Sequence, residues 1–214
     1  MNDIVLEARD VTFGYVPDRP VVENWSAEFP AGTMTALTGP SGRGKSTLLY
    51  LLGLMLRPSA GQVFVSGRTC GDLSDTKRAR LRAHSYGFVF QDSALDATRT
   101  VLDNVTETAL YRGLPRSKVT SQAQELLERF GVDVPVLRKP GQVSGGQAQR
   151  IALCRALLND PVIVLADEPT GNLDAGTAET VVAAMRERAR AGAAVIVVTH
   201  SLDVATLCDR EIRL

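Results

Sequence analysis

Residues 39–47 read Gly39-Pro40-Ser41-Gly42-Arg43-Gly44-Lys45-Ser46-Thr47. They fit the pattern G-x-x-x-x-G-K-[ST], and an apolar segment, residues 34–38, comes directly before them. Glycines let backbone N–H groups turn inward around a phosphate, and a helix after the loop adds its positive N-terminal end. We therefore interpret residues 39–47 as a phosphate-binding loop between a strand and a helix.

Two side chains of this loop have predicted chemical roles. Lys45 is expected to reach the β- and γ-phosphates of a nucleoside triphosphate, and the Ser46 hydroxyl to ligate Mg²⁺. A Gly-rich turn without a ligand leaves Lys45 unexplained. Arg43 stands where a small residue is more usual, so we expect its side chain to point outward, toward solvent or a facing subunit. Kinases, GTPases and motor ATPases all share such a loop, so it does not by itself define the function.

A second acidic element follows an apolar run at residues 162–166, where Asp167 and Glu168 stand next to each other. A carboxylate at the carboxyl end of a strand suits Mg²⁺, which we expect of Asp167. Glu168 is then placed to polarise a water for attack on the γ-phosphate. Two adjacent carboxylates can equally be a solvated strand end. The phosphate loop and the turn at Pro169 favour the catalytic interpretation.

Strand-like and helix-like segments alternate along the chain, which is typical of an α/β protein with a largely parallel sheet. The first two strands are expected to be antiparallel. A helical stretch, residues 92–158, appears inserted between residues 1–91 and 159–214. The expected strands are 4–15, 25–29, 34–38, 62–66, 86–90, 162–166, 195–199 and a last one ending at Leu214; the expected helices are 46–56, 75–84, 101–111, 117–130, 144–158 and 175–191.

Composition excludes several classes of protein. The 214 residues carry 24 basic and 24 acidic side chains, so the chain lacks the excess positive charge of nucleic-acid binders. The longest uncharged run, residues 29–42, is shorter than the ~20 apolar residues of a membrane-spanning helix. The start, Met1-Asn2-Asp3, lacks the layout of an export signal, which predicts a cytoplasmic protein.

Ser144-Gly145-Gly146-Gln147, after Val143, begins the third helix of the insert. A serine N-cap, two glycines that permit close approach, and the helix dipole together make a second anion site. One chain thus carries two phosphate-binding elements, roughly a hundred residues apart. We expect the second element of one subunit to close over the γ-phosphate that the first element of another subunit holds.

These motifs together resemble the nucleotide-binding subunit of an ABC transporter over essentially the whole chain, with Val143 where the family usually has Leu. Six markers occur in the family's order: Tyr15, Gln91, residues 143–147, Asp167-Glu168, Asn172-Leu173-Asp174 and His200. The resemblance implies the P-loop NTPase fold, a RecA-like core with a mostly parallel sheet and an N-terminal antiparallel β region. It also implies one ABC-type domain over residues 1–214, with residues 92–158 as an inserted α-helical subdomain.

The resemblance implies a role for each matching residue. Tyr15 would stack on adenine, although an ordinary strand aromatic is the plain alternative. Gln91 would contact Mg²⁺ and the attacking water, and Asp174 would act across the dimer interface. His200 would hydrogen-bond the γ-phosphate and hold the water with Glu168. The cofactors implied are ATP and Mg²⁺, and residues 39–47 and 144–147 would bind the nucleotide from opposite sides of a homodimer.

Residues 104–113 and 166–174 look like the branch of ATPases that serves macrolide export, lipoprotein release and cell division. That likeness implies an integral membrane permease as partner, and a peripheral position on the inner face of the cell membrane. Residues 95–99, Leu-Asp-Ala-Thr-Arg, are polar where the branch has an apolar, proline-containing stretch, which leaves the permease undefined. A regulatory C-terminal domain is not expected.

Other functions remain as alternatives. A soluble, non-transport ABC ATPase would normally carry two such domains or a long coiled-coil insert, and a cell-division regulatory ATPase would share the branch motifs. A P-loop kinase would explain the loop and the carboxylates but gives no role to residues 144–147. A binding module without turnover is opposed by Glu168 and His200. We interpret the chain as an ATPase that drives a separate membrane protein.

Overall fold

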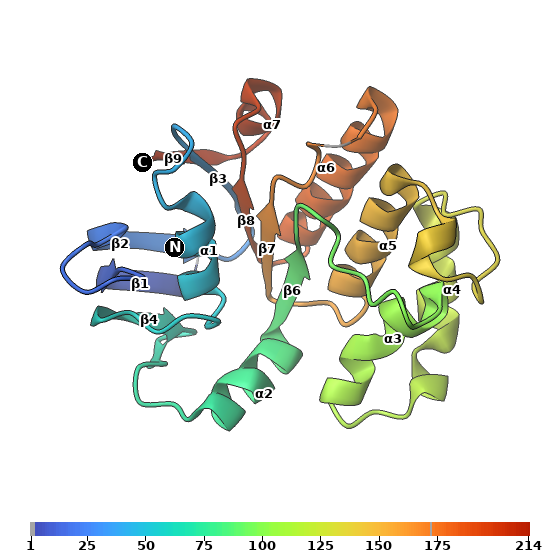
Figure 1. Cartoon of the computed structure of the whole chain (residues 1–214), viewed down its shortest axis with the longest axis horizontal. Helices are drawn as coiled ribbons and strands as arrows, with labels where there is room; N and C mark the ends of the chain where they lie inside the picture. Colours follow the sequence, from blue (N-terminus) through green and yellow to red (C-terminus); the bar gives the residue numbers. More distant parts are fainter. Residues whose placement is uncertain (1–2, 172) are drawn as a thin grey trace.

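The computed structural model describes residues 3–171 and 173–214, in which two β-sheets are packed with helices (Figure 1). One sheet has the order β2-β1-β4-β5 and the other the order β6-β7-β8-β3-β9. The α/β class predicted from the sequence is confirmed. The strands are β1 (Ile4–Phe13), β2 (Val22–Pro30), β3 (Met34–Thr38), β4 (Ala60–Val65), β5 (Arg68–Thr69), β6 (Tyr86–Val89), β7 (Ile163–Asp167), β8 (Ala194–Val198) and β9 (Arg210–Arg213).

The five-stranded sheet is parallel at every pairing between its strands. Its central strands β3, β7 and β8 are buried at every position, as expected for a parallel sheet that is covered on both faces. Parallel strands have their carboxyl ends at the same edge. The segments that follow β3, β7 and β8 therefore leave the sheet side by side, which is where ligands bind in such sheets.

The four-stranded sheet is antiparallel, which confirms the predicted N-terminal β region. Helix α1 (Lys45–Leu52) lies between the two sheets (Figure 1). Its Leu48 and Leu49 are buried in one hydrophobic cluster with Leu6 of β1 and Ile196 of β8. The helix that follows the phosphate loop is therefore fixed from two sides.

Alternation along the parallel strands separates two hydrophobic cores. In β7, Ile163 and Leu165 belong to the cluster shared with the antiparallel sheet, whereas Val164 and Ala166 belong to the cluster shared with the helices. Successive strand residues point to opposite faces, so each side of the sheet has its own core.

The remaining helices gather mainly on the second face of the parallel sheet (Figure 1). Val105 of α3, Leu127 of α4 and Ile151 of α5 share a buried cluster with Val164 of β7, so the inserted helices pack into the core of the sheet. No helix in the described ranges has both the length and the apolar character needed to cross a membrane. The bounds are α2 (Asp75–Ser85), α3 (Val101–Tyr111), η1 (Arg116–Lys118), α4 (Thr120–Arg129), η2 (Pro140–Gln142), α5 (Gly145–Leu157), α6 (Ala175–Arg190) and α7 (Leu202–Thr206).

Helix α1 is shorter than predicted. It ends at Leu52, whereas the predicted helix ran to residue 56. Gly53 follows it, and a Cβ there would lie 2.7 Å from Cε1 of Phe88, so the chain passes close to β6. Leu54 then adopts the left-handed conformation, with φ of 57°, which ends the helix. Gly53 is itself a local stop signal, and the close approach of Phe88 adds a reason why no larger residue stands there.

Candidate functional site

The phosphate loop leaves the carboxyl end of β3 and turns into α1 at Gly44, the N-cap residue. Gly44 has φ of 80°, and a Cβ there would lie 2.9 Å from the Val21 carbonyl oxygen, so no larger residue fits. The N-cap supplies no side-chain hydrogen bond to the first turn. The first N–H groups of α1 are therefore left to bind an anion.

Lys45 lies across this loop. Its Nζ donates hydrogen bonds to the carbonyl oxygens of Gly39, at 2.8 Å, and Pro40, at 2.9 Å. The ammonium group is thereby kept above the turn at which phosphates would bind. Arg43 is exposed, in agreement with its predicted outward direction.

A cleft of about 450 Å³ joins the phosphate loop to the acidic pair. The loop, the end of β7, the end of β8 and the segment after β6 all contribute to its walls. Most residues predicted for the site from sequence therefore come together in one place. The lining residues are Val21, Ser41, Gly42, Gly44, Lys45, Ser46, Thr47, Gln91, Asp167, Glu168, Val198 and His200.

Asp167 supplies a buried carboxylate at the base of this cleft, with only 5% of the residue exposed. Burial raises the pKa of Asp167 most; the neighbouring Glu168 raises it further, whereas a hydrogen bond with Ser46 and the charge of Lys45 lower it. A carboxylate desolvated in this way gains from a cation. Oxygens of Ser46, Asp167 and Gln91 are the hard ligands that Mg²⁺ prefers, and Mg²⁺ typically takes few of its ligands from protein, so the donor set fits that ion.

Glu168 and His200 form a hydrogen-bonded pair at the same edge of the sheet. The distance between His200 Nδ1 and Glu168 Oε1 is 2.8 Å, and the Thr199 hydroxyl donates to Glu168 Oε2 at 3.4 Å. The Glu168 side chain is 12% exposed and the His200 side chain 72%. A shielded carboxylate oriented by two neighbours beside a phosphate site is suited to accept a proton.

The backbone of Glu168 is also unusual. Its φ is 45°, a left-handed conformation that is uncommon for residues other than glycine, and its N–H donates to the Val198 carbonyl at 2.9 Å. This bond links the ends of β7 and β8. Backbone conformations of this kind are concentrated at functional sites.

Residues 144–147 lie outside the residues that line the cleft. Ser144 is the N-cap of α5: its Oγ accepts from the Gln147 N–H at 3.2 Å, and Gln147 Oε1 accepts from the Ser144 N–H at 2.8 Å. Ser144 and Gly145 are exposed. The predicted second anion site is therefore a capped, accessible helix start outside the cleft of this chain's own phosphate loop.

Asp174 and Tyr15 lie beyond the cleft as well. Asp174 is the N-cap of α6, and its carboxylate accepts from the Thr177 N–H at 2.9 Å and the Thr177 hydroxyl at 2.7 Å. These two bonds are the main reason why the pKa of Asp174 is lowered. Tyr15 is 62% exposed and its hydroxyl lies 3.4 Å from Thr47 Oγ1, so its ring stands beside the loop. Asn172, one of the sequence markers, lies outside the described residues.

Sequence reasoning missed three residues of the site: Val21 and Val198 line the cleft, and Thr199 orients Glu168. Thr199 had a readable signal, because it is the first polar residue after the apolar strand that leads to His200. Val21 has no such signal, since it reaches the site from the start of β2.

A comparison with protein-family models matches residues 22–171 to the family described as ABC transporter. The chain belongs to the ABC transporter family. With its phosphate loop and acidic pair in one cleft, it is an ATP-binding cassette ATPase of that family.

The relatives of the ABC ATPase include proteins of lipoprotein release and macrolide export, which is the branch that its motifs predicted. It is 43% identical to the lipoprotein-releasing system ATP-binding protein LolD of Maricaulis maris, over 98% of this chain and 93% of that protein. It is 38% identical to the macrolide export ATP-binding/permease protein MacB of Vibrio parahaemolyticus, over 100% of this chain but only 33% of MacB.

Solved structures of ABC cassettes match the fold closely. The dimeric structure of MJ0796, a bacterial ABC transporter cassette, is 33% identical with a TM-score of 0.91, over 98% of this chain and 94% of that one. A dimeric post-hydrolysis state of MJ0796 bound to ADP and Pi gives 32% identity and a TM-score of 0.90, with the same coverage.

Proposed function

We propose that this ABC ATPase hydrolyses ATP in a head-to-tail homodimer and thereby drives a separate integral membrane permease. One observation carries the proposal. The phosphate loop, the acidic pair and His200 share a cleft, whereas Ser144–Gln147 form a capped, accessible helix start outside it. A single chain therefore has one complete hydrolytic half and one half that needs another copy.

The first half binds ATP through the loop. The inward N–H groups at the start of α1 bind phosphate oxygens, and Lys45 exchanges its carbonyl partners for the β- and γ-phosphates. The exposed ring of Tyr15 stacks on adenine. Mg²⁺, held by Ser46, Asp167 and Gln91, would neutralise charge on the transferred phosphoryl group.

Hydrolysis uses the pair at the sheet edge. A water attacks the γ-phosphorus, Glu168 accepts its proton, and the bond between the γ-phosphorus and the bridging oxygen breaks to release ADP. His200, hydrogen-bonded to Glu168 at 2.8 Å, orients that carboxylate and donates to the γ-phosphate. Gln91 holds the water from the opposite side of the cleft.

The second copy completes the site. Ser144, Gly145, Gly146 and the N-terminal end of α5 approach the γ-phosphate of the partner, while Asp174 acts at the interface. The exposed, capped start of α5 supports this arrangement. The match to dimeric MJ0796 supports it independently.

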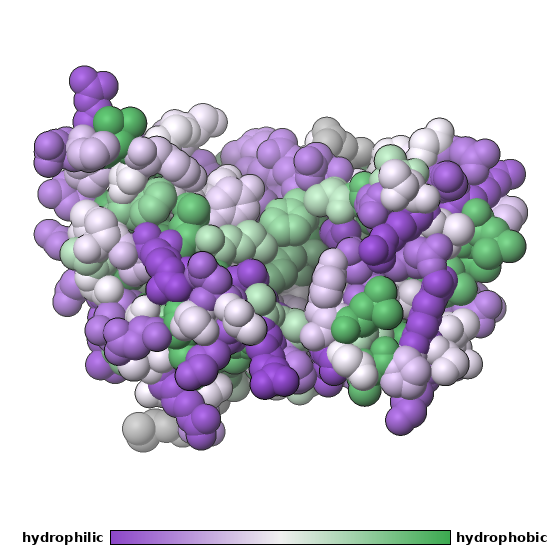
Figure 2. Space-filling view, turned by 60° about the horizontal axis from the view of Figure 1, so that its bottom comes forward, coloured by the Kyte–Doolittle hydropathy of each residue, from purple (hydrophilic) through white to green (hydrophobic). Residues whose placement is uncertain are grey.

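A groove of about 730 Å³ provides a surface for the permease. It runs between α2 and α3, and Figure 2 shows apolar surface in a hollow flanked by hydrophilic surface. Met55, Tyr86, Phe88, Phe90 and Tyr111 contribute its apolar wall. Phe90 directly precedes Gln91, so this groove and the nucleotide cleft share one segment of chain.

The relatives support a permease partner. LolD of Maricaulis maris is named as the ATP-binding protein of a lipoprotein-releasing system, and this chain matches 93% of it; MacB, of which this chain matches 33%, is named as an ATP-binding and permease protein. We infer from the LolD match that the permease is a separate subunit, and that it holds the ATPase at the inner face of the cell membrane. The LolD relatives favour lipoprotein release or export as the work performed.

The permease proposal is tested by co-purification from detergent-solubilised membranes of the source cells. A tagged Glu168→Gln chain with ATP is expected to retain one polytopic membrane protein, identified by mass spectrometry. Tyr111→Ala in the groove should lose it, whereas Tyr111→Phe, which keeps the ring, should retain it. If the Glu168→Gln chain retains no membrane protein, a soluble, non-transport ABC ATPase is favoured instead. If Tyr111→Ala retains the membrane protein as well as Glu168→Gln alone does, the groove is not where the permease binds.

A further inference from the structure

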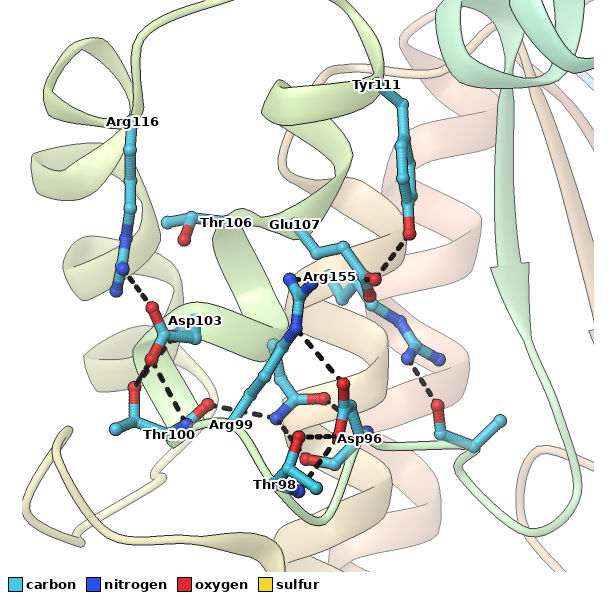
Figure 3. A network of polar contacts seen from close by, with 12 residues as sticks. Asp96, Thr98, Arg99, Thr100, Asp103, Thr106, Glu107, Tyr111, Arg116 and Arg155 are labelled. Atoms are coloured by element: carbon cyan, nitrogen blue, oxygen red, sulfur yellow. Dashed lines mark hydrogen bonds and ion pairs between the residues drawn. The ribbon is translucent and has the colours of Figure 1, made fainter.

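Helix α5 holds the chain on both sides of Gln91. Gln149 Nε2 donates to the Phe90 carbonyl at 3.1 Å, directly before Gln91. Arg155 Nη1 and Nη2 donate to the carbonyls of Ala94, at 2.6 Å, and Ser93, at 2.8 Å (Figure 3). The helix that begins at Ser144 is therefore bonded to the backbone around Gln91 at three carbonyl oxygens.

Arg155 is an unusual residue to find at this position. Only 9% of it is exposed, and burial lowers the pKa of its guanidinium, an effect that Glu107, Tyr111 and Asp92 partly oppose. Burying a charge in this way is costly unless the group is fully hydrogen-bonded. Its fork-shaped geometry makes two parallel, charge-assisted bonds, a pattern that lysine cannot reproduce.

The carbonyls that Arg155 binds belong to a strained turn. Ser93 has φ of 59° and Ala94 φ of 46°, so two consecutive residues other than glycine are left-handed. Such residues are strained and persist only where their surroundings fix them. Arg155 supplies that fixation, because both of its bonds end on these two residues.

The far end of the same segment is fixed too. Asn104, which is fully buried, accepts from the Asp96 N–H at 2.7 Å and donates to the Asp96 carbonyl at 3.0 Å. The Asp96 carboxylate accepts from Thr98 and pairs with Arg99 at 3.1 Å (Figure 3). The polar residues 95–99, which depart from the branch pattern, thus form a closed turn between Gln91 and α3.

Arg155 also lines the groove proposed for the permease, together with Phe90, Glu107 and Tyr111. We propose that Arg155 is a positioning residue for Gln91. By holding the turn at Ser93 and Ala94, Arg155 keeps Gln91 facing the nucleotide cleft. The inference rests on the proposed role of Gln91 in hydrolysis.

A double-mutant cycle tests this on the full chain, with kcat, KM for ATP and the Mg²⁺ dependence of turnover as readouts. Arg155→Lys keeps the charge but loses the fork, so kcat should fall by at least about tenfold with KM nearly unchanged. In a Gln91→Ala background the same substitution should change kcat by less than about twofold, because the group that it positions is gone.

A matched control is Arg188→Lys. Arg188 also donates to two loop carbonyls, Pro161 at 2.8 Å and Asp160 at 3.0 Å, but away from the cleft. Arg188→Lys should lower thermal stability about as much as Arg155→Lys does, but it should leave kcat unchanged. If Arg155→Lys does not fold, Gln149→Met removes the bond to Phe90 at similar volume and takes its place in the same cycle.

The outcomes distinguish the role proposed for Gln91 from the role proposed for Arg155. If Gln91→Ala alone leaves kcat unchanged, the role proposed for Gln91 is wrong and this inference falls with it. If Gln91→Ala lowers kcat while Arg155→Lys does not, or if the two effects simply add, Arg155 is an ordinary packing residue and only this inference is overturned.

Discussion

The imidazole of His200 and the carboxylate of Glu168 are joined by a 2.8 Å contact between Nδ1 and Oε1 at the ends of two adjacent parallel strands. The contact follows from the topology of the sheet. Glu168 comes directly after the end of β7, and His200 comes two residues after the end of β8. The Glu168 N–H bond to Val198 holds the two strand ends together. The two strand ends therefore hold the proposed base in a defined orientation.

Asp167→Asn is expected to stabilise the protein while abolishing turnover. Burial raises the pKa of Asp167, so the native state holds this proton more tightly than the unfolded chain does. Its contribution to stability therefore falls as pH rises from the ordinary value near 3.8 through the raised pKa, and stays unfavourable at neutral pH. Removing the charge should gain ~0.5–2 kcal/mol without Mg²⁺.

Thermal unfolding in EDTA, from acidic to neutral pH, measures this effect. The stability gain of Asp167→Asn should be largest at neutral pH and vanish toward low pH. Asp133→Asn, on an exposed carboxylate, serves as the control and should show neither effect. A variant no more stable than wild type at neutral pH would contradict the desolvation cost assigned to the Asp167 carboxylate.

Gly145→Ala should lower turnover without lowering the stability of the fold. An added Cβ at Gly145 meets nothing within 4 Å in this chain, and alanine is a better helix former than glycine. Stability and ATP affinity of the monomer should therefore be unchanged or slightly improved. Turnover should fall at least about tenfold, because the methyl group blocks close approach to the partner's γ-phosphate.

Gly141→Ala is the matched control, since a Cβ at Gly141 also meets nothing within 4 Å but lies in η2, before the predicted anion site. Its steady-state ATPase rate should equal that of wild type. Equal rates for Gly145→Ala and Gly141→Ala would count against a role for residues 144–147 in trans.

Tyr15→Ala should weaken ATP binding by about tenfold through lost stacking on adenine. Tyr15→Phe should retain most of the affinity, because the ring is kept and the 3.4 Å contact with Thr47 is long for a hydrogen bond. Isothermal titration with inorganic triphosphate, which has no base, provides the control and should give equal affinities. A loss of triphosphate affinity in Tyr15→Ala would indicate a role in holding the loop instead.

The sequence predicted what local chemistry determines. The apolar run before Gly39, the apolar run before Asp167 and the serine cap at Ser144 each carry their structure within a few residues. The parallel sheet followed from the alternation of segments, whereas the joint role of Glu168 and His200 followed from the resemblance to the ABC family.

The sequence could not predict what depends on distant contacts. Phe88 of a distant strand lies close to Gly53, which leaves no room there for a larger side chain, and the two left-handed residues Ser93 and Ala94 are bonded by Arg155, some sixty positions later. The predicted helix at 117–130 divides into η1 and α4, and the short α7 carries too few residues for a readable period. Nothing in the sequence distinguishes Arg155 from an exposed arginine on a helix, because its burial depends on the folded structure.

The most direct test of the account is the steady-state ATPase rate of Glu168→Gln, measured beside its oligomeric state by light scattering with Mg²⁺ and ATP. Glutamine keeps the contact with His200 but cannot accept the proton from water. We predict unchanged ATP affinity, a kcat lowered by at least about a hundredfold, and a stable dimer that wild type forms only transiently. Retained turnover in Glu168→Gln would contradict the assignment of Glu168 as the base.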